Sequence, residues 1–347
     1  MAVKFTKPEI NVREKLAELD KPSGIAGEAM LRAETPQEQF NLIGAGRRNL
    51  LINGDFQVSQ RGDFTSSQTL GTTSFQFYVD RWRIYAFNND LGYIQHFLDQ
   101  SLPDGSYANT LRITSGDSDL LAPLVQHVEN HKIVWGRDFT FSFWYKSTSD
   151  NMYNLWNGTT QEHFLLLSTA GTWVKYEKTF KFKENGAQLR IEFYSHSATF
   201  HSGAYLELAN LQLELGKVAT PFEHRSYGEE LALCQRYYYK INSAENNANY
   251  QRFAMVNIET STQAEALFIH PVTMRAIPTL ETTAVSGFHI FSANAISVVS
   301  GMAIDQASPY SVGVALTASG GGLTAGYVGL LDANNNKTAQ IAFDAEL

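Results

Sequence analysis

Few residue patterns in this 347-residue chain have the spacing that catalysis requires. A phosphate-binding loop needs Gly-x-x-x-x-Gly-Lys-Ser/Thr, but Gly216 and Lys217 are followed by Val218. The run Gly320–Gly322 follows a predicted strand without opening a helix, so it predicts a flexible turn and not a dinucleotide site. The sequence has no Gly-x-Ser-x-Gly motif. Cys234 falls in a predicted helix stripe, where a buried, unreactive thiol is expected.

A metal site is suggested by one alternating segment. His127, Glu129 and His131 would share one face if this segment is a strand, and zinc could be held there only if the side chains converge. Positions i and i+4 of a flat strand lie ~13 Å apart, from a rise of ~3.3 Å per residue, so the two histidines cannot share an ion. We therefore predict no metal site and no cofactor, and interpret the segment as a solvent-facing strand edge that runs into a turn.

Aromatic residues, 12% of the chain, are the main positive signal. Three tryptophans lie within strand patterns, which favours core positions: Trp82, Trp144 and Trp173. Residues 150–162 instead resemble a polar loop, and this loop contains two large rings. A loop ring either closes the end of a β-sandwich or offers a flat apolar face to a sugar, whose hydroxyls nearby Asn, Gln and His can bind. The candidate ligand-binding residues are Tyr153, Trp156 and Trp135.

The elements that must position these residues are mostly strands. Turn clusters separate runs that alternate or are rich in aromatic and β-branched residues: 82–87, 93–98, 110–114, 139–146, 173–182, 188–194 and 204–214. Many short strands without intervening helices predict an antiparallel jelly roll or β-sandwich over residues 50–225. TIM-barrel and Rossmann layouts are excluded because they need helices between the strands.

The regions before and after the predicted β-sandwich differ in their content of charged residues. Fifteen of the first 49 residues are charged, but only 11 of residues 241–347. The pattern of residues 1–49 predicts two short helices, over 12–20 and from Thr35 to about residue 44. Helices this short are marginal alone, so their apolar residues must pack onto the next domain or dock on a partner. Strand patterns return after residue 240, and subunit association would hide a surface so poor in charge.

A helix is predicted between the two β regions. Ser226 and Glu229 have the spacing of a capping box, which predicts a helix from Tyr227 to about Tyr238. A stripe of Leu231, Cys234 and Tyr238 would pack onto a sheet in a monomer or form a short coiled-coil neck in an oligomer. The sequence does not decide between these arrangements.

Composition excludes several classes of partner. The formal net charge of −8 argues against a general nucleic-acid-binding protein. No apolar run approaches the ~18 residues of a membrane span, so membrane insertion is not expected. The first residues lack the apolar segment of a secretory signal, and a single cysteine cannot form an intrachain disulfide.

Five blocks of sequence carry a resemblance to a known family: 49–62 (NLLINGDFQVSQRG), 78–82 (YVDRW), 211–216 (LQLELG), 219–227 (ATPFEHRSY) and 229–238 (EELALCQRYY). Together they resemble bacteriophage tail-fibre and related tail proteins. The front, residues 10–46, resembles fibre proteins of short-tailed marine phages, and NGDF at 53–56 is similar to the first strand of carbohydrate-binding jelly rolls. The resemblance implies a homotrimer fixed to the virion by its N-terminus, with distal β-domains that contact the host. Some such jelly rolls hold a structural calcium, for which Asp55 and Asn210 would be the positions.

We therefore expect a mainly β chain with a helical virion-attachment segment (1–49), a jelly-roll β-sandwich (50–225), a helical neck (226–240) and a β-rich trimeric tip (241–347). The expected function is that of a non-enzymatic tail fibre or receptor-binding subunit. It would be made in the host cytoplasm, reside in the virion tail, dock on tail proteins through residues 1–49 and bind host surface glycan through its β-domains. The alternatives are a purely structural adaptor between the tail and another fibre, and a tailspike-like glycan depolymerase.

Overall fold

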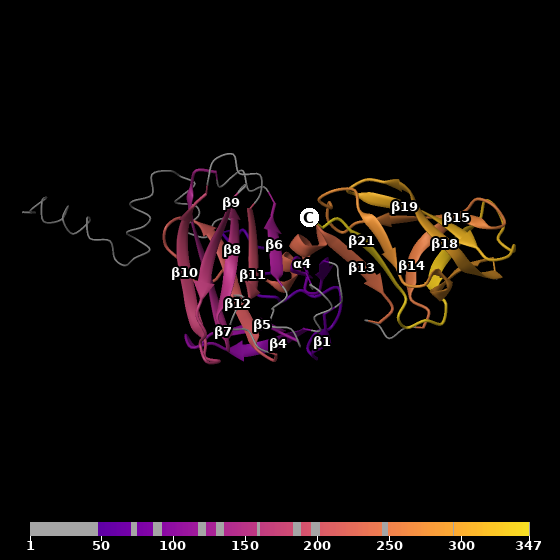
Figure 1. Ribbon diagram of the computed structural model, residues 1–347. Coiled ribbons are helices and arrows are strands. Elements are labelled where there is room, and N and C mark those ends of the chain that lie inside the picture. The colour runs from indigo at the N-terminus through magenta and orange to yellow at the C-terminus, as the bar shows by residue number, and fades with distance from the viewer. Residues whose placement is uncertain are drawn as a thin grey trace, which may run out of the picture.

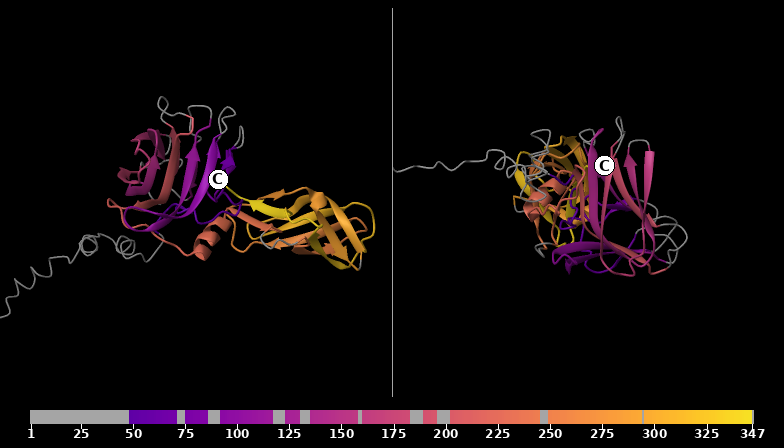
Figure 2. Two further views of the ribbon diagram at one scale, coloured as in Figure 1. Left: turned by 90° about the horizontal axis from the view of Figure 1, so that it is seen from below. Right: turned by 90° about the vertical axis from the view of Figure 1, so that its left-hand side faces the viewer.

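The computed structural model describes residues 48–70, 75–85, 92–116, 123–129, 135–157, 160–182, 189–195, 202–244, 249–293 and 295–346. Within these residues the chain is mainly β, with two β units and a short helix at their junction (Figure 1). Figure 2 shows the same two units side by side from another direction. The two helices predicted at the front of the chain lie outside the described residues.

The first unit is built from two six-stranded antiparallel sheets, which confirms the predicted β-sandwich. Sheet A has the order β1 (Gln68–Thr69), β4 (Tyr93–Ser101), β5 (Tyr107–Thr114), β12 (Tyr205–Leu215), β7 (Asp138–Ser147) and β10 (Val174–Lys181). Sheet B has the order β2 (Phe75–Phe77), β3 (Arg83–Tyr85), β6 (Leu124–Val128), β11 (Leu189–Ser195), β8 (Asn151–Asn157) and β9 (Thr160–Leu166).

Strand alternation builds the core between these sheets. Along β7, Phe139, Phe141 and Phe143 point inward, and each is at most 1% exposed. The rings of Phe141 and Phe143 meet Tyr153 of β8 and Phe193 of β11 at centroid distances between 5.3 and 6.1 Å. Tilted and edge-to-face contacts of this kind add to the stabilisation that burial provides.

Two sequence-based expectations for sheet B are wrong. Residues 150–162 were expected to form a polar loop, but most of them belong to the hairpin of β8 and β9. The segment around His127 was expected at a sheet edge, whereas β6 lies between β3 and β11 and His127 is half-buried. Polar residues lower the apparent β-propensity of these strands, while the cross-strand pairs that stabilise them come from segments distant in sequence.

A bulge in β12 keeps the apolar residues of this long strand on one face. Its pairing with β7 shifts register between Ala209 and Gln212, and Asn210 at the shift has a φ of 51°. Because the bulge adds one residue, alternation continues in phase with the core on both sides of it. The bulge also brings the backbone close to Gly54, where a Cβ would lie 2.2 Å from the carbonyl oxygen of Leu211. The inward-facing residues are Leu206, Leu208, Leu211 and Leu213.

Helix α4 (Tyr227–Gln235) begins at the predicted capping box. The Ser226 hydroxyl accepts the N–H of Glu229 at 3.4 Å, and the Glu229 carboxylate accepts the N–H of Ser226 at 2.9 Å. The helix ends earlier than expected because Tyr238 starts strand β13 (Tyr238–Asn242), so the predicted stripe does not extend to this tyrosine.

The apolar side of α4 packs within the same chain. Cys234 is fully buried in a cluster with Ile52, Val58 and Tyr237, which confirms the expectation of a buried thiol. Burial raises the pKa of this thiol well above its usual value. The buried Cys234 thus contacts Ile52 and Val58 of the same chain, which lie outside the strands, and not the face of a sheet.

The second unit combines a three-stranded sheet with a closed barrel. The sheet has the order β13, β21 (Gln340–Asp344) and β16 (Thr279–Thr282). The barrel has the order β14 (Arg252–Ile258), β15 (Gln263–Ile269), β19 (Ser311–Ala318), β18 (Ala295–Ala307), β17 (Phe288–Ser292) and β20 (Val328–Ala333), with the 3-10 helix η2 (Val285–Gly287) before β17. The prediction that strands return after residue 240 is confirmed.

Candidate functional site

The three ring residues selected from the sequence do not form one surface. Tyr153 is fully buried, stacks on Phe164 at 4.9 Å and donates its hydroxyl to Tyr176 at 3.1 Å. Its ring therefore belongs to the core and cannot meet a ligand in this conformation. Trp135 is partly buried against the same core. The backbone of Trp156 pairs with β11 and β9, and its side chain lies outside the described part.

A cleft of about 180 Å³ lies instead on the outer face of sheet A. Strands β7, β10 and β12 form its floor, the turn between β4 and β5 forms one side, and residues 220–224 form the opposite wall. The lining residues are Asp104, Ser106, Ser142, Phe143, Trp144, Lys175, Asn210, Thr220, Pro221, Phe222 and His224.

Trp144 gives the floor an aromatic surface. Phe143 and Tyr145, the residues on either side of it along β7, are buried in the core, so Trp144 points to the outer face. There it is half-buried and packs, with Trp173, on a small apolar cluster of Leu102, Ala108 and Ala209. The expectation that Trp144 and Trp173 are core residues of the sandwich is therefore wrong, although it is confirmed for the fully buried Trp82.

Asn210 provides the most unusual polar group in the cleft. It occupies the bulge of β12 and is only 6% exposed. Its side-chain oxygen is buried and has no hydrogen-bond partner in the described part of the chain. A buried acceptor without a donor typically destabilises a protein by about 1–3 kcal/mol.

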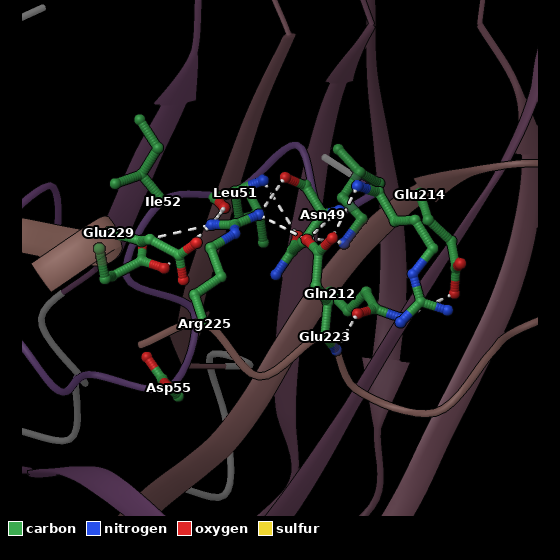
Figure 3. A network of polar contacts seen from close by, with 12 residues as sticks. Asn49, Leu51, Ile52, Asp55, Gln212, Glu214, Glu223, Arg225 and Glu229 are labelled. Carbon is green, nitrogen blue, oxygen red and sulfur yellow. Dashed lines mark hydrogen bonds and ion pairs between the residues drawn. The ribbon is translucent and has the colours of Figure 1, made fainter. Parts of the chain in front are cut away.

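The wall at 220–224 is held over sheet A by a network of polar contacts (Figure 3). Glu214 of β12 accepts the backbone N–H of Thr220 at 2.8 Å and its hydroxyl at 2.7 Å. Two residues earlier on β12, the side-chain oxygen of Gln212 accepts the N–H of Glu223 at 2.7 Å. Both strand residues are nearly fully buried, so water competes little for these bonds.

The same network ties the wall to the first described segment. The Glu223 carboxylate accepts the N–H groups of Arg48 and Asn49 at 3.0 and 2.9 Å. Arg225 binds Glu223 at 2.7 Å and Glu230 of α4 at 3.0 Å, and donates to the Asn49 carbonyl at 2.8 Å. Burial raises the pKa of Glu223, but these hydrogen bonds and the arginine outweigh it, and the pKa lies below its usual value.

The rim of the cleft carries two carboxylates, Asp104 and Glu177, and one cation, Lys175. Asp104 accepts the hydroxyl of Ser106 at 2.6 Å, and hydrogen bonds from this serine lower the pKa of Asp104. On the other side, Lys175 pairs with Glu177 at 2.6 Å. The lining includes one carboxylate, Asp104, whereas most glycoside hydrolases use two that face each other.

Behind the wall, burial and the charge of Glu230 raise the pKa of Asp55 to about 6.

The segment considered for a metal has other partners. The Nε2 atom of His127 lies 2.6 Å from the guanidinium of Arg83, and burial, together with this charge, lowers the pKa of His127 to about 3. Glu129 binds Arg236 at 3.0 Å and accepts the hydroxyl of Tyr237 at 2.6 Å. His131 lies outside the described residues, and within them no three His, Cys, Asp or Glu side chains gather as metal ligands would. No helix among these residues has the length and apolarity to span a bilayer.

Sequence reasoning missed the cleft residues, although part of the signal was present. Strict alternation along Phe139–Tyr145 already places Trp144 opposite the core. No comparable pattern marks Phe222 or His224, which reach the cleft only because of the network behind them. Asn210 had been considered only as a calcium position implied by family resemblance.

The sequence and the structure were both compared with those of known proteins. No protein-family model and no curated protein matches the sequence. Among solved structures, the enzymatically active domain of tailspike protein 4 from bacteriophage CBA120 matches with a TM-score of 0.32 and 13% identity, over 48% of this chain and 21% of that one.

Smaller domains match over their whole length. The CBM22-1 xylan-binding domain of Xyn10C from Paenibacillus barcinonensis has a TM-score of 0.29 and 14% identity, over 46% of this chain and 97% of that domain. A family 11 carbohydrate-binding module from Clostridium thermocellum, in complex with a mixed-linked tetrasaccharide, has a TM-score of 0.28 and 12% identity, over 46% of this chain and 98% of the module. Values this low do not identify what this chain binds.

Proposed function

We propose that this chain is a non-catalytic subunit of a phage tail that contacts host surface glycan through its sandwich. The observation that carries the proposal is the cleft on sheet A, which combines the aromatic floor of Trp144 with polar lining residues, among them Ser106, Ser142 and Asn210. The C–H face of a sugar ring stacks on an indole, and its hydroxyls bind amide and hydroxyl groups. Trp144 offers the first kind of contact, and Ser106 and Ser142 offer hydroxyl groups in the same cleft.

A non-catalytic role is favoured by the groups that line the cleft. Asp104 is the single carboxylate among the lining residues, and it is turned toward Ser106 at the rim. Hydrolysis by the usual route needs a proton donor and a second carboxylate on the opposite side of the sugar. The tailspike-like depolymerase is therefore the less favoured alternative.

The proposal includes a homotrimer, for which the barrel offers a surface. Cross-strand pairs join four apolar residues in a row. Met255 of β14 pairs with Leu330 of β20, Leu330 pairs with Phe291 of β17, and Phe291 pairs with Ile296 of β18. These four side chains form a continuous row on the outside of the barrel, with Met255 and Ile296 67% and 63% exposed. An exposed apolar row that crosses four strands is typical of a subunit contact. Three clefts per trimer, and many trimers per virion, would turn weak glycan contacts into firm attachment.

Residues 1–49 would dock this assembly on the tail proteins, residues 50–225 would contact glycan, and residues 241–347 would form the trimeric tip. The proposed location is therefore the virion tail. A purely structural adaptor between the tail and another fibre would share the trimer and the attachment segment, but would have no use for the cleft.

Binding of the full chain to host cells and to a glycan array tests the proposal. Trp144→Ala should abolish or strongly weaken binding. Trp173→Ala is the matched control, because Trp173 packs on the same apolar cluster but does not line the cleft. Binding that survives Trp144→Ala would place the glycan contact elsewhere, and a trimer that binds no cell or glycan would favour the adaptor.

Size-exclusion chromatography with light scattering, at micromolar concentration, tests the trimer separately. The wild-type chain should have three times the 38.7 kDa mass of one subunit. Leu330→Asp should release monomers, since a charge in the middle of the apolar row opposes its burial. A wild-type monomer at micromolar concentration would contradict the trimer without affecting the cleft.

A further inference from the structure

We propose that the sandwich binds an acidic glycan, whose carboxylate or sulfate group contacts Arg112 on the outer face of sheet A beside the cleft. This inference rests on the proposed glycan-binding function and names the ligand class of that face. Three features carry the argument: two cations that share one carboxylate, an open edge of the guanidinium, and the position of both next to the cleft floor.

Arg112, Glu207 and Lys146 form a charged row across three neighbouring strands. Glu207 of β12 pairs with Arg112 of β5 on one side and with Lys146 of β7 on the other. Leu206 and Leu208 beside Glu207 point into the core, so the charged row lies on the outer face of sheet A. One carboxylate oxygen of Glu207, Oε2, lies 2.6 Å from Nη2 of Arg112 and 3.2 Å from Nζ of Lys146.

The charged row carries one more positive charge than negative charges. Glu207 is fully buried, and its second oxygen accepts the hydroxyl of Thr110 at 2.6 Å. Arg112 alone would pair this carboxylate, because both its Nε and its Nη2 donate to Oε2, at 2.8 and 2.6 Å. Within the described part of the chain, neither Arg112 nor Lys146 forms an ion pair with another carboxylate. One positive charge of the row is therefore available to a ligand.

Arg112 presents an open edge to such a ligand. Its guanidinium lies 4.6 Å from the ring centroid of Phe97 and 4.3 Å from that of Tyr205, and these rings fix its orientation together with Glu207. The third nitrogen, Nη1, bonds to none of the residues that the structure describes and is not among the side-chain nitrogens closed to solvent. The side chain as a whole is 28% exposed. A guanidinium held in one orientation binds an oxyanion with little further loss of conformational freedom.

The charged row lies next to the aromatic floor of the cleft. Trp144 and Lys146 are two residues apart on β7 and face the same side, about 6.6 Å apart along the backbone, from a rise of ~3.3 Å per residue. Arg112 is two strands further across the sheet, at ~4.8 Å per strand, so its backbone lies about 12 Å from that of Trp144. A glycan with one ring on Trp144 must extend beyond that ring to reach Arg112. The charged group therefore belongs to a neighbouring sugar unit.

The carboxylates at the rim of the cleft lie away from the charged row. Glu177 of β10 pairs with Ser142, which is on the opposite side of Trp144 from the row. Asp104 belongs to the turn before β5, whereas the row crosses β5 near its other end. Charges more than ~8 Å apart are largely screened at physiological ionic strength, so the row acts on a bound glycan more strongly than the formal net charge of −8 does.

The experiment compares four variants of the full chain. Arg112→Met and Lys146→Met each remove one cation and leave Glu207 with the other, so both should fold, and melting temperatures verify this. Lys146→Arg keeps the charge of the row. The matched control is Lys217→Met, which removes a cation that is 76% exposed and pairs with Asp138 at 3.4 Å, outside the row.

Isothermal titration measures binding of matched acidic and neutral sugars. Trigalacturonate is compared with its methyl ester, which tests a carboxylate. Sialyllactose and sulfated lactose are compared with lactose, which separates a carboxylate from a sulfate on the same core. Each titration is repeated at increasing NaCl concentration.

We expect at least one acidic sugar to bind more tightly than its neutral counterpart, and this binding to weaken as salt is added. Arg112→Met and Lys146→Met should each weaken it about tenfold, from the loss of one charge-assisted interaction, whereas Lys146→Arg and Lys217→Met should keep it. A purely structural role of Lys146 would lower the melting temperature of Lys146→Met without changing the preference for the acidic sugar.

Three results would overturn the inference and leave the proposed function intact. These are equal binding of the acidic and neutral sugars, wild-type affinity in both methionine variants, and a chain that binds the glycan array but none of these acidic sugars. If the wild-type chain binds neither these sugars nor the glycan array nor host cells, the inference and the proposed function both fail.

Discussion

Arg225 connects the wall of the cleft to the rest of the sandwich, and its replacement by Met gives a quantitative prediction. The Arg225 side chain is 10% exposed, and its guanidinium lies 2.7 Å from the carboxylate of Glu223 and 3.0 Å from that of Glu230, whose side chains are 15% and 3% exposed. Met preserves much of the apolar length of the side chain but leaves both carboxylates without this cation. Removal of one partner from a buried ion pair destabilises proteins by about 3–5 kcal/mol, and we expect a loss of this size in the free energy of unfolding.

Tryptophan fluorescence in urea measures this loss for the sandwich, because all five tryptophans of the chain lie between Trp82 and Trp173. The control is Lys175→Met, which breaks a pair whose side chains are 43% and 46% exposed and should change stability by less than about 1 kcal/mol. If Arg225→Met loses no more than this control, the reasoning is refuted. The backbone N–H groups that reach Glu223 would then be sufficient to stabilise it.

Three further predictions concern buried titratable groups. Burial raises the pKa of Asp80 to about 7, so the folded chain holds this proton more tightly than the unfolded chain does. The free energy of unfolding of the wild type, relative to that of Asp80→Asn, should therefore fall as pH rises from 4 to 7. Urea titrations across this range measure it, and a rise with pH would contradict the prediction. His127 has the opposite effect, because its pKa is lowered to about 3 in the folded chain. The unfolded chain takes up a proton at this histidine below pH ~6.5, so the wild type loses stability as pH falls. His127→Gln should therefore gain stability relative to the wild type from pH 6 to pH 4. The buried Cys234 thiol should react with iodoacetamide only after denaturation, and rapid labelling of the native chain would contradict its position.

Local patterns in the sequence predicted much of the fold because their causes are local. Alternation along 139–146 gave a strand, and the capping box at Ser226 gave the start of α4, since each depends on neighbouring residues. The hairpin of β8 and β9 was missed because its stability comes from pairing with β11, more than 30 residues away in the chain. The same limit explains why Tyr153 was assigned to a ligand surface and lies in the core.

The sequence by itself determined that the chain is rich in strands and that Cys234 is buried. Only the tertiary structure decided which outer face becomes a cleft. That face is closed by residues 220–224, which are held by contacts to Arg48 and Asn49 more than 170 positions earlier in the chain. Alternation assigns a side chain to one face of a strand, but what covers that face depends on contacts between distant segments, and no pattern within one segment contains them.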